Sequence, residues 1–231
     1  MNKLVRGFVT VGTALSAMLL VTGVASAATW SSSAAFGSWT DEGYYFNNDV
    51  WGSGAGAQTI WANSPGNWGV WSDQPNTGGV KSYPHVGKDV SKTLSALSGV
   101  TSNFTVSTPS AGSFETAYDI WANGSGYEIM LWVDKTGSVG PIGSQVATAT
   151  VGGSTWNVYS GSNGSNPVYS FLRTSNTSSG SVDILAVLKW IESKGWYGDV
   201  TLSTVQFGWE ISSTNNTGEN FADTAFAVNA S

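Results

Sequence analysis

The sequence predicts a single all-β domain, and three observations support this fold class. Only 10% of the 231 residues are charged and 29 are Gly, a composition typical of short strands joined by turns. Runs in which apolar and polar residues alternate strictly recur along the chain. Residues 182–196 alone show the apolar spacing of an amphipathic helix. We therefore expect many short strands and one α-helix that packs on the outside of a sheet.

The predicted elements follow one another without an internal repeat or a linker. Aromatic residues alternate with polar ones from 30 to 61, and glycine-rich turns break this run into short strands. The predicted helix has Ser181 as its candidate N-cap and Gly195 as its stop. The other predicted strands lie at 61–71 (a hairpin), 103–106, 114–121, 127–133, 146–151, 155–159, 168–174, 200–209 and 224–228.

Residues 1–27 have the features of a secretory signal peptide. Lys3 and Arg6 precede an interrupted apolar run, and residues 25–27 supply a small-residue cleavage site. The alternative is a membrane anchor, which the shortness of the apolar run disfavours. We expect cleavage near Ala27, secretion, and a mature domain over residues 28–231 that does not contact a membrane.

Composition also limits the chemistry and the partners of the chain. The net charge of −6 disfavours nucleic acid and is compatible with an uncharged partner. The absence of cysteine excludes disulfides and thiol chemistry. His85 is the only histidine, and no G-x-S-x-G elbow accompanies it, so a Ser-His-Asp hydrolase is unsupported. With no second His and no Cys we expect no metal, and no cofactor motif is present.

The strand at 127–133 carries one carboxylate on its polar face. Tyr127, Ile129, Leu131 and Val133 share the predicted core face, and the opposite face carries Glu128, Met130 and Trp132. On this spacing alone, Glu128 could simply be a solvated residue of an antiparallel strand. The strand at 114–121 would pair with it as a hairpin, which could place Asp119 on the same face as Glu128.

A second strand, at 204–211, repeats this pattern around Glu210. Val205, Phe207, Trp209 and Ile211 take the core face, and Gln206, Gly208 and Glu210 take the other. Two glutamates on an aromatic-lined face are typical of a glycosidase, in which one acid protonates the leaving oxygen and the other attacks or activates water. The spacing does not tell whether the two glutamates face each other. A carbohydrate-binding module without turnover is the competing class. Glu115 is a rival carboxylate that we expect to be solvated at a strand end, and Asp134, Asp183, Asp199 and Asp223 are expected to be surface charges in turns.

These two strands resemble the signature strands of glycoside hydrolase family 12 endoglucanases. The resemblance rests on residues 127–132 with Gly-Pro-Ile-Gly-Ser at 140–144, and on residues 205–210. Residues 80–84, residues 117–119 and the single helix resemble the same family in the same order. The resemblance implies a β-jelly roll sandwich of two curved antiparallel sheets, whose concave sheet forms an open cleft for a β-1,4-linked glucan.

The resemblance also implies roles for individual residues. It makes Glu128 the nucleophile, Glu210 the general acid and base, and Asp119 a hydrogen-bond partner of the nucleophile. The expected substrate contacts are Trp51, Met130, Trp132, Asn48 and Gln206. The family usually has one residue fewer between its Asn pair and the Trp than residues 47–51 have here, which displaces Asn48 from the family pattern, and it has an Asn where this chain has His85.

The implied activity is that of a secreted, monomeric endo-β-1,4-glucanase that retains the anomeric configuration of cellulose-type substrates. A xyloglucan-specific endoglucanase of the same family is an alternative.

Overall fold

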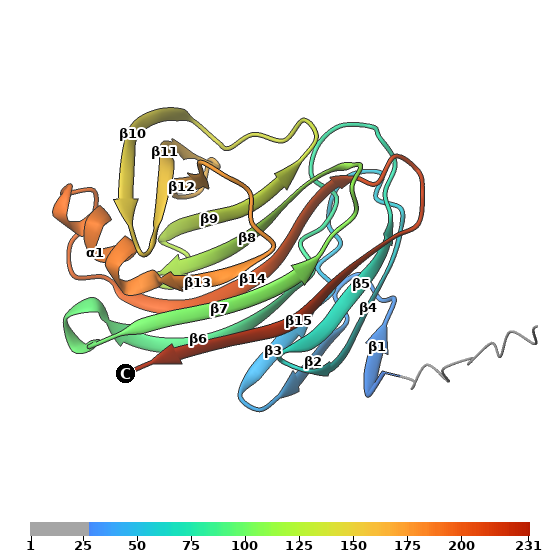
Figure 1. Cartoon of the computed structure of the whole chain (residues 1–231), viewed down its shortest axis with the longest axis horizontal. Coiled ribbons are helices and arrows are strands. Elements are labelled where there is room, and N and C mark those ends of the chain that lie inside the picture. The colour runs from blue at the N-terminus through green and yellow to red at the C-terminus, as the bar shows by residue number, and fades with distance from the viewer. Residues whose placement is uncertain (1–27) are drawn as a thin grey trace, which may run out of the picture.

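Two β-sheets pack face to face in the computed structural model, which describes residues 28–231 (Figure 1). The predicted signal peptide, residues 1–27, lies outside the described residues. The smaller sheet has six strands in the order β1 (Trp30–Ser32), β4 (Ala57–Ser64), β5 (Asn67–Asp73), β15 (Glu219–Ala230), β7 (Val100–Ser107) and β13 (Ser179–Asp183).

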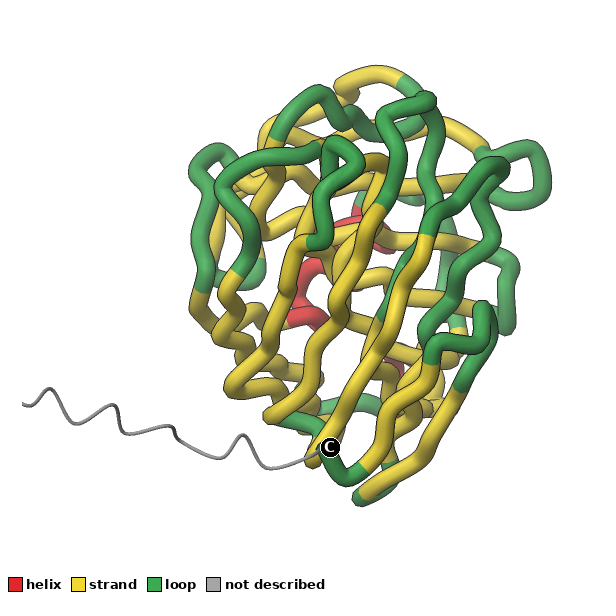
Figure 2. Tube along the Cα trace, turned by 90° about the vertical axis from the view of Figure 1, so that its right-hand side faces the viewer, coloured by secondary structure: helices red, strands yellow, loops and turns green. Residues whose placement is uncertain are grey.

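The larger sheet has nine strands and carries both of the candidate acidic strands. Its order is β10 (Ser144–Val151), β11 (Ser154–Ser162), β12 (Pro167–Arg173), β9 (Tyr127–Thr136), β8 (Ser113–Ala122), β14 (Thr201–Ser213), β6 (His85–Thr93), β3 (Tyr44–Asn47) and β2 (Ser38–Asp41). The tube view in Figure 2 shows how strands make up most of both layers. The expected all-β jelly-roll sandwich with one helix is therefore confirmed.

One strand pair differs from the expected antiparallel pattern. β12 runs parallel to β9, with Val168 opposite Glu128 and Leu172 opposite Trp132. The other strand pairs among the described residues are antiparallel. The parallel pair brings the loop that precedes β12 to the start of β9.

The core lies between the two sheets and consists of the inward faces that alternation predicts. On β9, Ile129 and Leu131 are fully buried, as expected from their parity. Aromatic rings from the two layers meet there: Phe207 of β14 stacks on Phe226 of β15 with ring centroids 5.3 Å apart, and Trp209 lies 4.7 Å from Trp68 of β5. The opposite parity of β9 and β14 is thereby turned to the outer, concave face of the nine-stranded sheet.

The single α-helix, α1, spans Ile184–Ser193, within the predicted range. Asp183, not Ser181, is its N-cap, because Ser181 belongs to β13 and the Asp183 carboxylate accepts a hydrogen bond from the Ala186 amide. Gly195 follows the helix with a φ of +68°, a left-handed conformation that glycine adopts without strain.

The position of α1 differs from the expectation that it covers the outside of one sheet. Its buried side chains belong to the main core and it contacts β7 and β10, one strand from each sheet. The helix therefore closes one side of the sandwich (Figure 1). A single turn of 3-10 helix, η1 (Leu94–Ala96), follows β6. No helix among residues 28–231 is long and apolar enough to span a membrane.

Candidate active site

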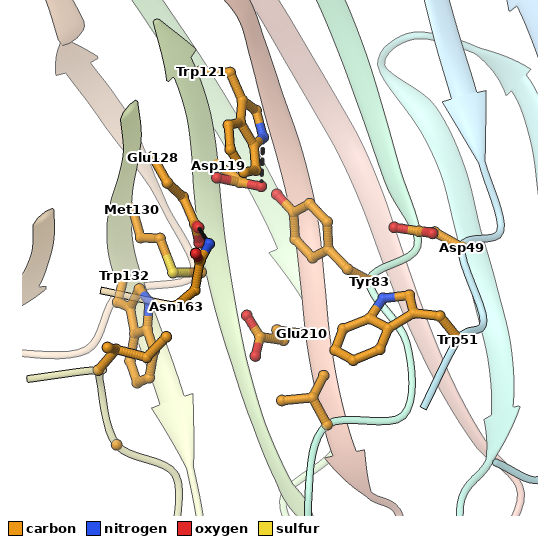
Figure 3. A pocket seen from close by; sticks show the side chains of 13 residues that line it. Asp49, Trp51, Tyr83, Asp119, Trp121, Glu128, Met130, Trp132, Asn163 and Glu210 are labelled. Carbon is orange, nitrogen blue, oxygen red and sulfur yellow. Dashed lines mark hydrogen bonds between the residues drawn. The ribbon is translucent and has the colours of Figure 1, made fainter. Parts of the chain in front are cut away.

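The concave face of the nine-stranded sheet holds a groove of about 450 Å³. It is lined by carboxylates, aromatic rings and a few apolar side chains, and Figure 3 shows most of these projecting into it. The lining residues are Asp49, Trp51, Val80, Tyr83, Asp119, Trp121, Glu128, Met130, Trp132, Gly140, Ile142, Asn163 and Glu210. Six of the residues predicted from the sequence are thus brought together: Glu128, Glu210, Asp119, Trp51, Met130 and Trp132.

Strand register explains how these side chains meet. β8 lies between β9 and β14, and it pairs Trp121 with Glu128 and Asp119 with Met130. Since opposite residues of an antiparallel pair project to the same side, this register gives the groove one continuous set of side chains. β14 adds Glu210 from the other edge of β8. The predicted hairpin formed by residues 114–121 and 127–133 is confirmed.

Glu128 is held by amide groups from the loop before β12. The Asn163 side-chain amide donates a hydrogen bond of 2.8 Å to Oε2 of Glu128. Asn163 in turn is fixed by Asn166, whose Oδ1 accepts a bond of 3.0 Å from the same amide nitrogen. Burial raises the pKa of Glu128, and hydrogen bonds from Asn163 and Asn166 oppose that rise. These donors favour the ionised carboxylate.

Glu210 differs from Glu128 in what acts on its carboxyl group besides burial. Burial, reinforced by the nearby charge of Glu128, raises the pKa of Glu210 to about 7, and a hydrogen bond with Glu115 partly offsets the rise. Glu210 is therefore protonated in mildly acidic solution, where Glu128 can be ionised. Two carboxyl groups of unlike protonation in one groove can act as a proton donor and a nucleophile or base.

Asp119 lies between Glu128 and Tyr83 in the groove (Figure 3). Its Oδ2 accepts a hydrogen bond of 2.9 Å from the indole nitrogen of Trp121, and its buried Oδ1 has no partner among the described residues. Burial, with the charge of Glu128 next in importance, raises the pKa of Asp119 well above its ordinary value. A protonated Asp119 has one oxygen free to donate a hydrogen bond.

The structure contradicts the prediction for Asn48 and does not support that for Gln206. Asn48 has no exposed surface; its amide donates to the carbonyl oxygen of Ala34, and its Oδ1 accepts from Gln58. It cannot reach a sugar in the groove, and its neighbour Asp49 lines the groove instead. The Gln206 amide donates to the hydroxyl of Tyr45, and Gln206 is not one of the lining residues.

Two further expectations concern carboxylates and are wrong. Glu115 is not a solvated strand end: it is 2% exposed and lies directly opposite Glu210 in the β8–β14 register. Asp223 is not a surface charge in a turn but a fully buried residue of β15. Sequence reasoning assumed solvation for both because an isolated acidic residue is usually exposed.

His85 is a buried structural residue. Its Nδ1 lies 2.7 Å from the carbonyl oxygen of Tyr83, and its ring stacks on the Tyr83 ring at 4.9 Å. Burial lowers the pKa of His85 to about 4, so the ring is neutral near pH 7. Residues 28–231 contain no cluster of three or more His, Cys, Asp or Glu residues that could hold a metal ion.

Sequence reasoning missed several residues that line the groove. Trp121 has the parity of Asp119 but was not predicted as a substrate contact, and Tyr83 belongs to a recognised segment whose direction was not assigned. Asn163 is a residue type typical of turns, and in the structure it forms one: its Oδ1 accepts hydrogen bonds from the backbone amides of Ser165 and Asn166. Nothing in the spacing of the chain connects this turn with Glu128.

Comparison with known proteins identifies the family. The model of Glycosyl hydrolase family 12 matches residues 26–229. The chain belongs to glycosyl hydrolase family 12. Among solved structures, the xyloglucanase domain of an effector from Sinorhizobium fredii, in complex with cellobiose, is 43% identical with a TM-score of 0.85, and the match covers 88% of this chain and 99% of that one.

Other relatives of this family 12 member carry related names. A family 12 xyloglucanase from Bacillus licheniformis has a TM-score of 0.79 at 28% identity, over 87% of this chain and all of that one. A xyloglucan-specific endo-β-1,4-glucanase A from Emericella nidulans is 40% identical over 57% of this chain and 59% of that protein. The chain thus matches about three fifths of the length of this curated relative.

Proposed function

We propose that this family 12 member is an endo-β-1,4-glucanase that cleaves internal bonds of a β-1,4-glucan with retention of anomeric configuration. The observation that carries the proposal is that Glu128 and Glu210 line one groove and are both buried, with amide donors that lower the pKa of Glu128 and a neighbouring negative charge that raises the pKa of Glu210. A binding module has no use for two carboxyl groups with such different proton affinities.

In the first step, Glu128 attacks the anomeric carbon while Glu210 protonates the departing glycosidic oxygen. The Asn163 amide keeps Glu128 ionised and oriented before the attack. The raised pKa of Glu210 supplies the proton at the pH where Glu128 is still a nucleophile. The result is a glycosyl ester on Glu128 and a carboxylate on Glu210.

In the second step, Glu210 becomes the base. The ester on Glu128 carries no charge, so the electrostatic cause that raised the pKa of Glu210 is removed. Glu210 can then take a proton from the incoming water, whose oxygen attacks the anomeric carbon from the side opposite the ester. The bond between that carbon and Glu128 breaks, and Glu128 leaves as a carboxylate. Two inversions at one carbon give net retention.

Asp119 is proposed to support the nucleophile. Its burial and the neighbouring charge of Glu128 raise its pKa, which favours the protonated form, and Oδ1 is the oxygen not already bonded to Trp121. A hydrogen bond from this carboxyl to Glu128 would hold the nucleophile in position while leaving it charged. Trp51, Met130 and Trp132 provide apolar surface on which the faces of sugar rings can pack.

Xyloglucan is a second candidate substrate, favoured by the names of the relatives. The Sinorhizobium and Bacillus structures and the Emericella protein are all described as xyloglucanases. The groove is open at its mouth, where Trp51 is 55% exposed, and an open wall can admit a branched backbone. An unbranched cellulose-type chain is the other candidate for the same groove.

The experiment is a comparison of initial rates on carboxymethylcellulose, mixed-linkage β-glucan and xyloglucan, measured by new reducing ends. We expect turnover on at least one polymer, loss of more than 99% of it in Glu128→Gln, and the β-anomer as the first product in proton NMR. Binding without turnover would support the carbohydrate-binding alternative instead. An α-anomer as first product would contradict the double displacement.

We also propose that residues 1–27 are a signal peptide, that residues 28–231 are the catalytic domain, and that the mature enzyme acts outside the cell as a monomer. Mass spectrometry of the protein recovered from culture medium would test the cleavage site near Ala27, and sedimentation would test the monomer.

A further inference from the structure

Glu115 is a buried carboxyl group for which the proposed mechanism has no use. It lies on β8, four residues before Asp119, and it does not line the groove. The β8–β14 register places it directly opposite Glu210, near enough for a hydrogen bond between the two carboxyl groups to affect the pKa of each. Since a hydrogen bond between two carboxyl groups needs one proton, at least one of the pair is protonated.

The groups around Glu115 decide which of the two holds that proton. On β9, Lys135 is paired with Glu115 in the strand register. The side chain of Lys135 is exposed, however, and its ammonium group donates to the carbonyl oxygen of Val139 at 3.5 Å. On the β14 side stands Glu210, itself close to the charge of Glu128. Burial, assisted by Glu210, raises the pKa of Glu115 well above its ordinary value, against a weaker opposite effect of Lys135.

Glu210 is also surrounded by acidic groups on its other sides. The charge of Glu128 on β9 raises the pKa of Glu210. The charge of Glu210 in turn raises the pKa of Asp119 on β8 and of Tyr83 in the segment before β6. When Glu210 has given its proton to the leaving group, it is a carboxylate in a crowded acidic site. A donor that is still protonated at that moment stabilises it.

We propose that Glu115 is a positioning residue for Glu210: it remains protonated, donates its O–H to the Glu210 carboxyl from the neighbouring strand, and holds that carboxyl at the groove. This inference rests on the proposed role of Glu210 as acid and base. Glu115 acts through Glu210 and does not touch the sugar. Its proton stays on Glu115 throughout both steps.

The protonation state of Glu115 decides whether Glu115 lowers or raises the pKa of Glu210. A neutral donor lowers the pKa of Glu210, because it favours the ionised form. An ionised Glu115 would do the reverse, because a second negative charge raises that pKa. Replacing Glu115 therefore shifts the titration of Glu210 upward if Glu115 is a neutral donor and downward if Glu115 is charged.

The test compares Glu115→Gln, which keeps a neutral donor of similar shape, with Glu115→Leu, which removes it. The Glu210 carboxyl is titrated by 13C NMR in protein labelled at the glutamate side chain, with Glu210→Gln used to assign its signal. We expect its pKa in Glu115→Leu to rise by about one unit, the tenfold change in proton affinity that one hydrogen bond to a charged group supplies. In Glu115→Gln it should stay within about 0.3 units.

The pH profile of kcat/KM provides the second readout. The pH at which its basic limb falls should follow the pKa of Glu210 measured by NMR. It should rise in Glu115→Leu and stay unchanged in Glu115→Gln. Glu219→Gln, which removes a carboxylate from β15 in the other sheet, is the matched control and should move neither. A downward shift in both Glu115 variants, or no shift in Glu115→Leu with its native fold confirmed by circular dichroism, overturns the proposal.

The NMR titration separates this inference from the proposed function. It reports the Glu115–Glu210 interaction in the free enzyme, whether or not the protein turns over any glucan. Inactivity of the unaltered protein on every polymer would refute the glucanase proposal, and an unshifted Glu210 signal in an active enzyme would refute only the role of Glu115.

Discussion

The side-chain amide of Asn163 donates a hydrogen bond of 2.8 Å to Oε2 of Glu128, although the two residues are 35 positions apart in the chain. The contact depends on β12, which runs parallel to β9 and places Val168 beside Glu128. The loop from 163 to 166 is thereby fixed at the start of β9. A carboxylate that accepts such a donor is favoured in its charged form.

Asn163→Ala should weaken the nucleophile in acid. Loss of the amide removes one hydrogen bond that holds the pKa of Glu128 down, so the acidic limb of the kcat/KM profile should rise by about half a pH unit. The limb is measured on a soluble β-glucan between pH 3 and 7. Ser165→Ala, an exposed change in the same loop, is the control and should leave the limb in place. An unmoved limb in Asn163→Ala would contradict the assigned contact.

Glu210→Gln should separate the two carboxyl roles. Without the acid, cleavage of a polymer loses the roughly 10²- to 10⁴-fold that general acid catalysis provides. An aryl cellobioside with a nitrophenolate leaving group needs no protonation, so its glycosylation step should be little affected. Glu128→Gln should abolish both reactions, because no ester can form. The two substrates are compared by burst-phase kinetics, and equal losses on both in Glu210→Gln would argue against its role as the acid.

Alternation within single strands made much of this site predictable. β9 and β14 bury one parity in the core, and the opposite parity carries Glu128, Met130, Trp132 and Glu210. These side chains could be assigned because the two-residue period of a strand is a local property. The hairpin of β8 and β9 was also local, so Asp119 could be placed on the correct face.

Other parts of the site depend on contacts between distant segments, which local patterns do not encode. Asn163 reaches Glu128 only through the parallel β12–β9 pair. Glu115 has the parity of the groove face, which alternation predicts to be solvated, yet it is buried at its position opposite Glu210 on the neighbouring strand. Asp49 has a φ of +41°, which turns the loop so that Asn48 points into the protein and Asp49 lines the groove. The extra residue within 47–51 indicated that this loop differs from the family pattern. It did not indicate which side chain would point into the groove.

Trp51→Ala should weaken binding more than chemistry. The indole lines the groove, and 55% of the surface of Trp51 is exposed. A ring that packs on a sugar equally well before and during reaction contributes uniform binding, so KM should rise about tenfold with kcat within about twofold. Trp71→Ala, an exposed Trp on β5 in the other sheet, should change neither constant. A fall in kcat at unchanged KM would show that Trp51 acts on the transition state instead.

Asp223→Asn should stabilise the fold in neutral and alkaline solution. Asp223 is fully buried; Oδ1 accepts a hydrogen bond from the Ala225 amide and Oδ2 has no partner among the described residues. Burial raises the pKa of Asp223 to about 7. Because this folded-state pKa lies above the unfolded value of 3.8, the neutral carboxyl favours the folded state below pH 3.8, and this stability is lost as pH rises through 7.

The size of this effect follows from the difference between the two pKa values. Above pH 7 the buried charge costs up to about 4 kcal/mol, which an uncharged amide of the same shape avoids. Thermal unfolding of Asp223→Asn should therefore show a Tm several degrees above that of the unaltered protein at pH 8 and close to it at pH 4.5. Asp199→Asn, at an exposed residue whose carboxylate accepts hydrogen bonds from the amide and the hydroxyl of Ser95, should show no such gain at pH 8. An equal Tm change at both pH values would mean that the gain does not come from removal of a buried charge.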